Sequence, residues 1–123
     1  MRSSLRLLFL TTLLLPICSW GQQIYLIGDA GEPKSPDPNL ELLKEKIKTA
    51  SSEDFLIFLG DNIYPKGALS PFDKQFKDKF ERPFRLVNRK FYMIAGNHDW
   101  KGSIRAQIDY SKLSKKWRFP QRY

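Results

Sequence analysis

Three short polar clusters carry most of the residue types in this chain that could do chemistry. They occupy residues 28–31, 60–64 and 96–99, and each directly follows an apolar run. Together they supply carboxylate, carboxamide, phenol and imidazole groups. Oxygen donors of this kind bind hard cations, and with imidazole they suit iron, manganese or zinc. The candidate metal-binding and catalytic residues are Asp29, Asp61, Tyr64, Asn97 and His98.

The apolar runs before the clusters predict three strands that hold these side chains at one place. Residues 24–27, 55–59 and 91–95 are apolar, β-branched or aromatic and lead into glycine, a pattern typical of strands buried on both faces. The clusters begin at residues 28, 60 and 96, a spacing of roughly one strand-plus-crossover unit. Parallel strands place their carboxyl ends at one edge of a sheet, where α/β proteins build sites. We therefore expect the three clusters to converge.

The segments between the strands predict helices. Strands are expected at 23–28 and 90–95 and from Phe55 onward, and residues 51–54 form a turn. Apolar residues three and four apart predict a helix over 39–50, with Asp37 or Asn39 as its cap. A phenylalanine every four residues predicts a second helix that ends before Pro83 and packs its aromatic face in the core. Beyond Gly102 a further helix is expected. The second helix presents Phe72, Phe76 and Phe80, and the last presents Ile104, Ile108 and Leu113.

The length of 123 residues leaves room for one small domain, with an α/β order of β-α-β-α-β and right-handed crossovers. Residues 1–21 are expected to be a signal peptide, with two arginines before an apolar stretch and a cut before Gln22. A membrane anchor, a buried first strand and lipid attachment at Cys18 are the alternatives. Cys18 is the single cysteine, so the mature part 22–123 could form no disulfide. We expect an exported protein, secreted or periplasmic, without a stable membrane anchor.

The positive charge does not predict a nucleic-acid partner. Loss of the two arginines in the signal segment lowers the net charge from +8 to +6. The remaining positive residues are spread over 44–48, 74–79 and 112–118, mostly on helix-like polar faces, and no nucleic-acid motif occurs. The charge favours a mild attraction to anionic substrates.

The clusters contain what a hydrolytic pair of metal ions needs. Such ions lie about 3.5–4 Å apart, share a bridging anion and turn a water into a nucleophile. Asp61 could bridge them, Asp29 could hold one ion, and Asn97 could hold the other. The Tyr64 phenolate could reach the first ion and would favour Fe(III). His98 would then lie beside the metals and donate to a leaving oxygen or bind phosphate.

Each residue also has an ordinary structural explanation when it is taken alone. Asp29 and Asp61 could cap loops or turns, Tyr64 could pack, and His98 could be structural. Asp99 is expected to support the site or its turn rather than to bind metal. The order of three clusters on three strand ends favours the chemical interpretation.

At these residues the sequence resembles the calcineurin-like metallophosphoesterases. Their GD-x-G, GD-x-x and GNH-E/D motifs correspond to residues 28–31, 60–64 and 96–99. Within that superfamily the chain is most similar to the purple, tartrate-resistant acid phosphatases. Tyr64, Gly67 and the stretches 102–111 and 114–120 carry this closer resemblance.

The resemblance implies a four-layer αββα sandwich that hydrolyses phosphate monoesters at a binuclear centre of Fe(III) and a divalent ion, Fe, Zn or Mn. It implies Asp29 and Tyr64 on Fe(III), Asp61 as the bridge, Asn97 on the divalent ion, and His98 in contact with substrate. The substrate would be a small phosphate ester or a phosphoprotein. Ala30 departs from the family, which often has Trp there, and this affects the wall of the site only.

The family completes its metal shell with histidines from its second half, including a Gly-His-x-His cluster, whereas His98 is the single histidine here. We therefore expect residues 22–123 to be the N-terminal portion of an incomplete phosphoesterase domain, inactive or nearly so in isolation. Half a sandwich would expose an apolar sheet face. Two alternatives stay open: a secreted, non-catalytic binding module of the same fold, and a metallophosphoesterase that acts on diesters or nucleotides.

Overall fold

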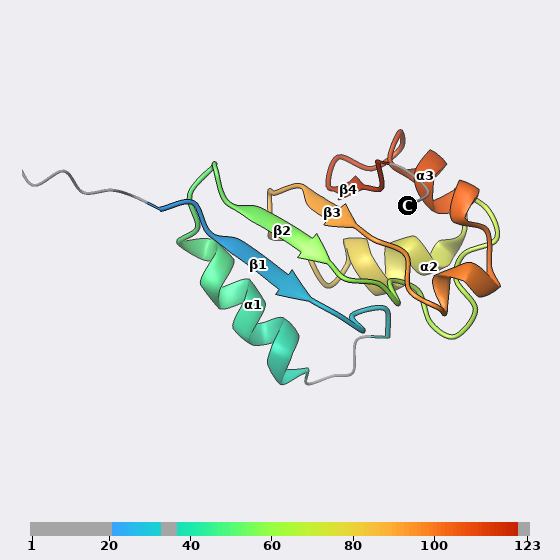
Figure 1. Cartoon of the computed structure of the whole chain (residues 1–123), viewed down its shortest axis with the longest axis horizontal. Helices are drawn as coiled ribbons and strands as arrows, with labels where there is room; N and C mark the ends of the chain where they lie inside the picture. Colours follow the sequence, from blue (N-terminus) through green and yellow to red (C-terminus); the bar gives the residue numbers. More distant parts are fainter. Residues whose placement is uncertain (1–20, 33–36, 121–123) are drawn as a thin grey trace, which may run out of the picture.

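The computed structural model describes residues 21–32 and 37–120. Four parallel strands form one sheet in the order β1-β2-β3-β4, so each new strand is added beside the previous one (Figure 1). The α/β class and the three predicted strands are confirmed, and a short fourth strand is added. The predicted signal peptide lies outside the described residues, apart from Gly21. The strands are β1 Ile24–Ile27, β2 Phe55–Phe58, β3 Phe91–Met93 and β4 Trp117–Arg118.

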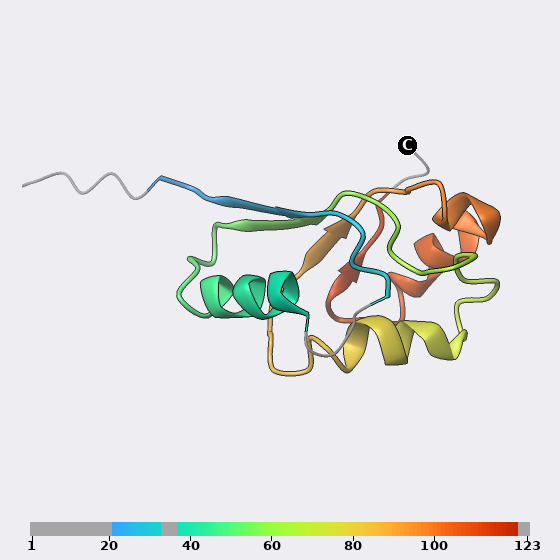
Figure 2. The same cartoon turned by 90° about the horizontal axis from the view of Figure 1, so that it is seen from below.

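Helices connect the strands and lie against one face of the sheet, as Figure 2 shows for α1 and α2. The crossover from β1 to β2 contains α1, and the crossover from β2 to β3 contains α2, which continues directly into the π-helix η1. The 3-10 helix η2 and α3 lie between β3 and β4. The helices are α1 Pro38–Lys48, α2 Lys74–Phe76, η1 Lys77–Glu81, η2 Asp99–Lys101 and α3 Ile104–Tyr110.

Local sequence explains where α1 begins and which way it faces. The Asp37 carboxylate accepts the N–H groups of Asn39 and Leu40 at 3.1 Å, so Asp37 rather than Asn39 is the cap. A proline at the first helical position suits this start because its missing N–H would be unpaired there anyway. The buried residues Leu40, Leu43 and Ile47 then recur on one side of the helix. The helix ends at Lys48, two residues before the predicted end.

The core is an aromatic cluster between the sheet and the α2–η1 segment. Phe58 and Phe91 from the sheet meet Phe80 and Phe84 with ring centroids 4.8–6.0 Å apart, mostly edge to face. All four side chains are buried. Each such side chain contributes about 1.5–3 kcal/mol through removal from water, and edge-to-face pairs add to this.

The predicted aromatic face of the second helix is correct for two of its three residues. Phe76 and Phe80 are completely buried, but Phe72 is 82% exposed. The reason is the start of the helix: the Asp73 carboxylate caps α2 by accepting the Gln75 N–H, which leaves Phe72 outside the helical period. Likewise α3 ends at Tyr110, so Leu113 is not on its apolar face and is 54% exposed.

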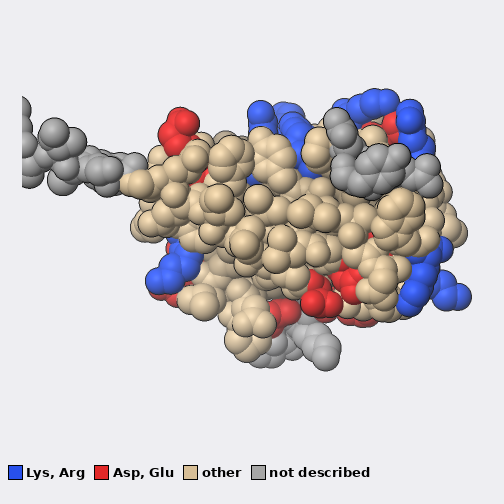
Figure 3. Space-filling model, viewed as in Figure 1, with Lys and Arg blue, Asp and Glu red and all other residues tan. Residues whose placement is uncertain are grey.

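The opposite face of the sheet lacks a cover in the described part of the chain. Ile24, Leu26, Leu59 and Ile94 are about half exposed on it, so the prediction of strands buried on both faces is wrong for these positions. Figure 3 shows the corresponding surface as a broad area without Lys, Arg, Asp or Glu, with charged side chains around its margin. This is the apolar face that half of a two-sheet sandwich was expected to expose.

Candidate metal centre

The loops after β1, β2 and β3 carry the candidate residues and lie along one edge of the sheet (Figure 1). Hydrogen bonds join the first two loops directly. The Asp29 N–H donates to the Gly60 carbonyl at 3.3 Å, and the Gly31 N–H donates to the Asp61 carbonyl at 3.0 Å. The Tyr64 N–H donates back to the Gly31 carbonyl at 3.2 Å. The two loops thus hold Asp29, Asp61 and Tyr64 in fixed relative positions.

Two glycines allow the loops to approach this closely. A Cβ atom on Gly31 would lie 2.4 Å from the backbone of Asp61 and Asn62. A Cβ atom on Gly96 would lie 2.2 Å from both the backbone nitrogen and the Oδ1 atom of Asp61. Real side chains do not tolerate such distances, so both positions require glycine.

The Tyr64 hydroxyl brings the three oxygen-bearing side chains together. Its Oη atom lies 2.6 Å from Asp29 Oδ1 and 2.8 Å from Asp61 Oδ2. A phenol has one proton and cannot donate fully to two carboxylates at once. Three acidic oxygen donors around one proton are a donor set that a hard cation fits.

Contacts with the two carboxylates raise the pKa of Tyr64. The hydrogen bond to Asp29 contributes most, followed by the one to Asp61, and desolvation and the two negative charges act in the same direction. Without metal the phenol therefore stays protonated. A cation that binds its oxygen would have to displace that proton.

Both aspartates have a left-handed backbone. The φ angle is 55° at Asp29 and 53° at Asp61, a region that residues other than glycine visit rarely. Aspartate tolerates it better than most residues, but it still costs on the order of 1 kcal/mol or more. Strain of this kind concentrates at functional sites, because the required side chain can then be held where a regular strand end would not place it.

Asp61 is buried and ionised. Burial by itself would raise its pKa, but the His98 N–H, the Tyr64 hydroxyl and the nearby positive charges of His98 and Lys101 lower it overall. The His98 N–H donates to Asp61 Oδ1 at 2.9 Å. The carboxylate at the predicted bridging position is therefore connected to both the second and the third loop.

The His98 ring lies against Tyr64 and has a defined orientation. Its Nδ1 atom lies 2.7 Å from the Pro65 carbonyl, and since a carbonyl only accepts, Nδ1 carries a proton. This leaves Nε2 as the nitrogen for other partners. The ring centroid is 4.2 Å from that of Tyr64, and the Lys101 ammonium lies 3.4 Å from Nδ1. Sequence reasoning missed Pro65 and Lys101, because neither belongs to a recognisable motif.

Asn97 is less closely tied to the others. It lies between Gly96 and His98 on the third loop and is exposed. Within residues 21–32 and 37–120, no hydrogen bond joins its side chain to Asp29, Asp61 or Tyr64, and no three His, Cys, Asp or Glu residues cluster. The structure therefore brings Asp29, Asp61, Tyr64 and His98 together. Asn97 lies near them only because it precedes His98 in the sequence.

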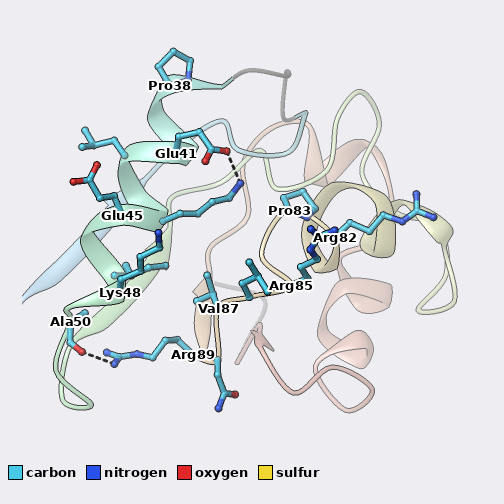
Figure 4. A pocket seen from close by; sticks show the side chains of 15 residues that line it. Pro38, Glu41, Glu45, Lys48, Ala50, Arg82, Pro83, Arg85, Val87 and Arg89 are labelled. Atoms are coloured by element: carbon cyan, nitrogen blue, oxygen red, sulfur yellow. Dashed lines mark hydrogen bonds and ion pairs between the residues drawn. The ribbon is translucent and has the colours of Figure 1, made fainter.

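A separate groove lies away from this edge. It has a volume of about 1110 Å³ and runs between α1 and the segment 82–89 (Figure 4). Lys48 and Arg85 are among its lining residues, and the Arg89 guanidinium donates to the Ala50 carbonyl at 3.1 Å at one end. None of the candidate metal-binding residues lines it.

Comparison with known proteins identifies relatives of the chain. The sequence model of the calcineurin-like phosphoesterase family matches residues 23–123. Tartrate-resistant acid phosphatase type 5 of Mus musculus is 39% identical over 107 residues, which cover 79% of this chain and 32% of that protein. The same enzyme of Homo sapiens is 39% identical, over 93% of this chain and 39% of that protein. Purple acid phosphatase 3 of Arabidopsis thaliana is 34% identical over 68% of this chain and 24% of its own length.

A solved structure shares the fold. It is described as GAP50, the anchor in the inner membrane complex of Plasmodium, and it superposes with a TM-score of 0.65 at 21% identity. The match covers 80% of this chain and 34% of that one. The chain thus spans about a third of the length of the proteins it matches.

Proposed function

The chain belongs to the calcineurin-like phosphoesterase family, and from this premise we propose that the intact protein hydrolyses phosphate monoesters at a binuclear metal centre. The observation that carries the proposal is the contact of the Tyr64 hydroxyl with both Asp29 and Asp61. A tyrosine oxygen between two carboxylates supports an Fe(III) site, since phenolate is a hard and strongly donating ligand. The similarity to purple and tartrate-resistant acid phosphatases supports monoesters rather than diesters.

In this proposal Asp29 and Tyr64 would hold Fe(III), Asn97 would hold a divalent ion, Fe, Zn or Mn, and Asp61 would be shared between the two. When bound, the ions supply a nucleophile at acidic or neutral pH and neutralise phosphate charge. The remaining ligands would come from outside the residues described above. Asp61 fits the bridging role because it is ionised, buried and held by the His98 N–H and the Tyr64 hydroxyl.

His98 is proposed as the residue that contacts substrate. The Pro65 carbonyl holds Nδ1 as a donor, so the imidazole can present Nε2 to a phosphoryl or leaving oxygen. With a second proton the ring donates from Nε2 and carries a positive charge that suits an anionic substrate. The Lys101 ammonium, 3.4 Å from Nδ1, adds a second positive charge beside the same ring.

The proposed location is outside the cytoplasm, secreted or periplasmic, and the proposed substrates are small phosphate esters or phosphoproteins. The similarity to tartrate-resistant acid phosphatases is compatible with export. In the described ranges, no helix has the length and apolar character needed to cross a bilayer.

The test is metal analysis combined with hydrolysis of a phosphomonoester and a phosphodiester at acidic pH, on the intact protein. We expect two metal ions, monoester turnover, and loss of both in Asp61→Asn. Asp78→Asn is the matched control, because Asp78 is a partly exposed carboxylate that pairs with Arg82 on the helical side. A metal-free intact protein without turnover would favour the non-catalytic binding module. Turnover of diesters only would favour the alternative phosphoesterase.

A further inference from the structure

Asp99 follows His98 and is completely buried, although it is not one of the proposed metal ligands. Its carboxylate accepts backbone N–H groups from two different loops. The Asn62 N–H lies 3.1 Å from both oxygens, the Ile63 N–H lies 3.2 Å from Oδ1, and the Gly96 N–H lies 2.9 Å from Oδ2. One side chain therefore joins the loop after β2 to the loop after β3.

Two amide side chains complete the shell of this carboxylate. Asn62 Nδ2 donates to Oδ2 at 3.1 Å and also to the Ile94 carbonyl at 2.7 Å. Gln107 Nε2, from α3, donates to Oδ1 at 3.0 Å. In the described part of the chain no Lys, Arg or His pairs with Asp99, so neutral N–H groups alone balance its charge. We name this set, Asn62, Asp99 and Gln107 with the N–H groups of Ile63 and Gly96, the Asp99 clamp.

The chemistry of the clamp requires a carboxylate. Both oxygens face donors, and an ionised carboxylate accepts on both. An asparagine at this position would turn an NH₂ group toward N–H donors and would keep only one acceptor. The clamp also lies next to the proposed ligands: Asn62 follows Asp61, and Gly96 precedes Asn97.

From this geometry we infer that Asp99 is a positioning residue of the metal centre, and that Gln107 supports it from α3. The clamp fixes the distance between the loop that carries Asp61 and Tyr64 and the loop that carries Asn97 and His98. The inference rests on the proposed function, since positioning matters only when those loops hold metal. A purely structural role would affect folding and leave metal affinity unchanged.

The experiment compares Asp99→Asn with the unmodified protein, both in the intact form that carries the remaining proposed ligands. Zn(II) is the probe, because it needs no redox control, and calorimetric titration gives its dissociation constant. We expect Zn(II) affinity to fall about 10- to 100-fold, the usual effect of removing a partner that orients metal ligands. Asp109→Asn is the matched control, because Asp109 lies on α3 and pairs at the surface with Arg105 and Lys112. Its Zn(II) affinity should equal that of the unmodified chain.

Gln107→Met guards against a variant that fails to fold. Gln107 Oε1 is buried without a hydrogen-bond partner among the described residues, so methionine removes one satisfied donor and one unsatisfied acceptor. Its unfolding midpoint should fall, because one hydrogen bond to the buried Asp99 carboxylate is lost, but unfolding should stay cooperative, while Zn(II) affinity falls several-fold. Amide hydrogen exchange in the metal-free state is the second readout, and the N–H groups of Asn62, Ile63 and Gly96 should exchange faster in Asp99→Asn.

The outcomes separate the two claims. Unchanged Zn(II) affinity in both clamp variants, or unchanged exchange at the three amides, would overturn the positioning role. Failure of the unmodified intact protein to bind Zn(II), with the exchange effect present, would refute the proposed function instead, because the clamp would then hold loops that carry no metal.

Discussion

Replacement of Gly96 by alanine should damage the candidate metal centre although no proposed ligand is itself substituted. The added Cβ atom would lie 2.2 Å from Asp61 N and Oδ1 and 2.9 Å from its Cγ. Non-bonded carbon contacts settle at about 3.5 Å, so Asp61 would have to retreat by more than about 1 Å. The hydrogen bond from His98 N to Asp61 Oδ1, now 2.9 Å, would then exceed the range of a real hydrogen bond.

The cost can be worked from these two effects. Overpacking a rigid site costs about 1–3 kcal/mol, and loss of a hydrogen bond to a charged acceptor costs about 1.5–3 kcal/mol. The sum, roughly 2.5–6 kcal/mol, corresponds to a fall in melting temperature of about 10 °C or more for a domain of this size. We also expect Zn(II) binding to be lost, because the displaced Asp61 carboxylate would no longer meet the Tyr64 hydroxyl, which also contacts Asp29.

The assay is a thermal melt and a Zn(II) titration of the intact protein, with Gly28→Ala as the matched control. A Cβ atom on Gly28 would meet nothing closer than Leu59 Cβ at 4.0 Å, an ordinary contact, so this variant should melt and bind like the unmodified chain. The two glycines end equivalent strands, and only the space around them differs. Equal melting temperature and Zn(II) affinity in the two variants would refute the reasoning.

Three further predictions follow from the same structure. Because the pKa of Tyr64 is raised, metal binding at its oxygen releases a proton, and metal affinity should rise about tenfold per pH unit. Tyr64→Phe should remove this proton from the pH dependence of the metal titration and abolish the charge-transfer colour of the iron form. Burial alone would raise the pKa of Asp73, but hydrogen bonds led by the one from the Gln75 N–H hold this pKa below 3.8. The Asp73 helix cap therefore stabilises the fold above that pH and is lost on acidification. Asp73→Ala should lower the free energy of urea unfolding by about 1 kcal/mol at pH 7 and by almost nothing at pH well below 3.8. Phe76→Ala should cost about 3–5 kcal/mol and Phe72→Ala less than about 0.5 kcal/mol in the same measurement, and equal costs would contradict the assigned start of the helix.

The sequence was sufficient to predict three of the four strands and the three loops, because each of those strands is a short apolar run that leads into glycine, whereas β4 is two residues long and has no such pattern. It also indicated that Asp29, Asp61 and Tyr64 would meet, since parallel strand order follows from short crossovers. The sequence pattern wrongly predicted that Phe72 lies on the buried face of the helix. The Asp73 side chain caps the helix and makes it begin after Phe72, the first phenylalanine of the series.

The parts of the site that sequence reasoning missed depend on tertiary contacts. Gln107 lies on a helix, and nothing in the surrounding residues indicates that its amide meets Asp99. Pro65 acts only through a backbone carbonyl, which every residue has. Such partners become visible only when the loops after β2 and β3 are placed side by side.

The left-handed backbone at Asp29 and Asp61 has a consequence for how descendants of this gene diverge. Glycine adopts such φ angles without the penalty that a side chain pays, which is about 1 kcal/mol or more at each position. A copy released from the proposed catalysis would relieve this strain by exchanging Asp29 for glycine, whereas Asp61 would still serve the fold because it accepts hydrogen bonds from the His98 N–H and the Tyr64 hydroxyl. Under the proposed function, aspartate at position 29 is therefore the more informative sign of a lineage that still binds metal.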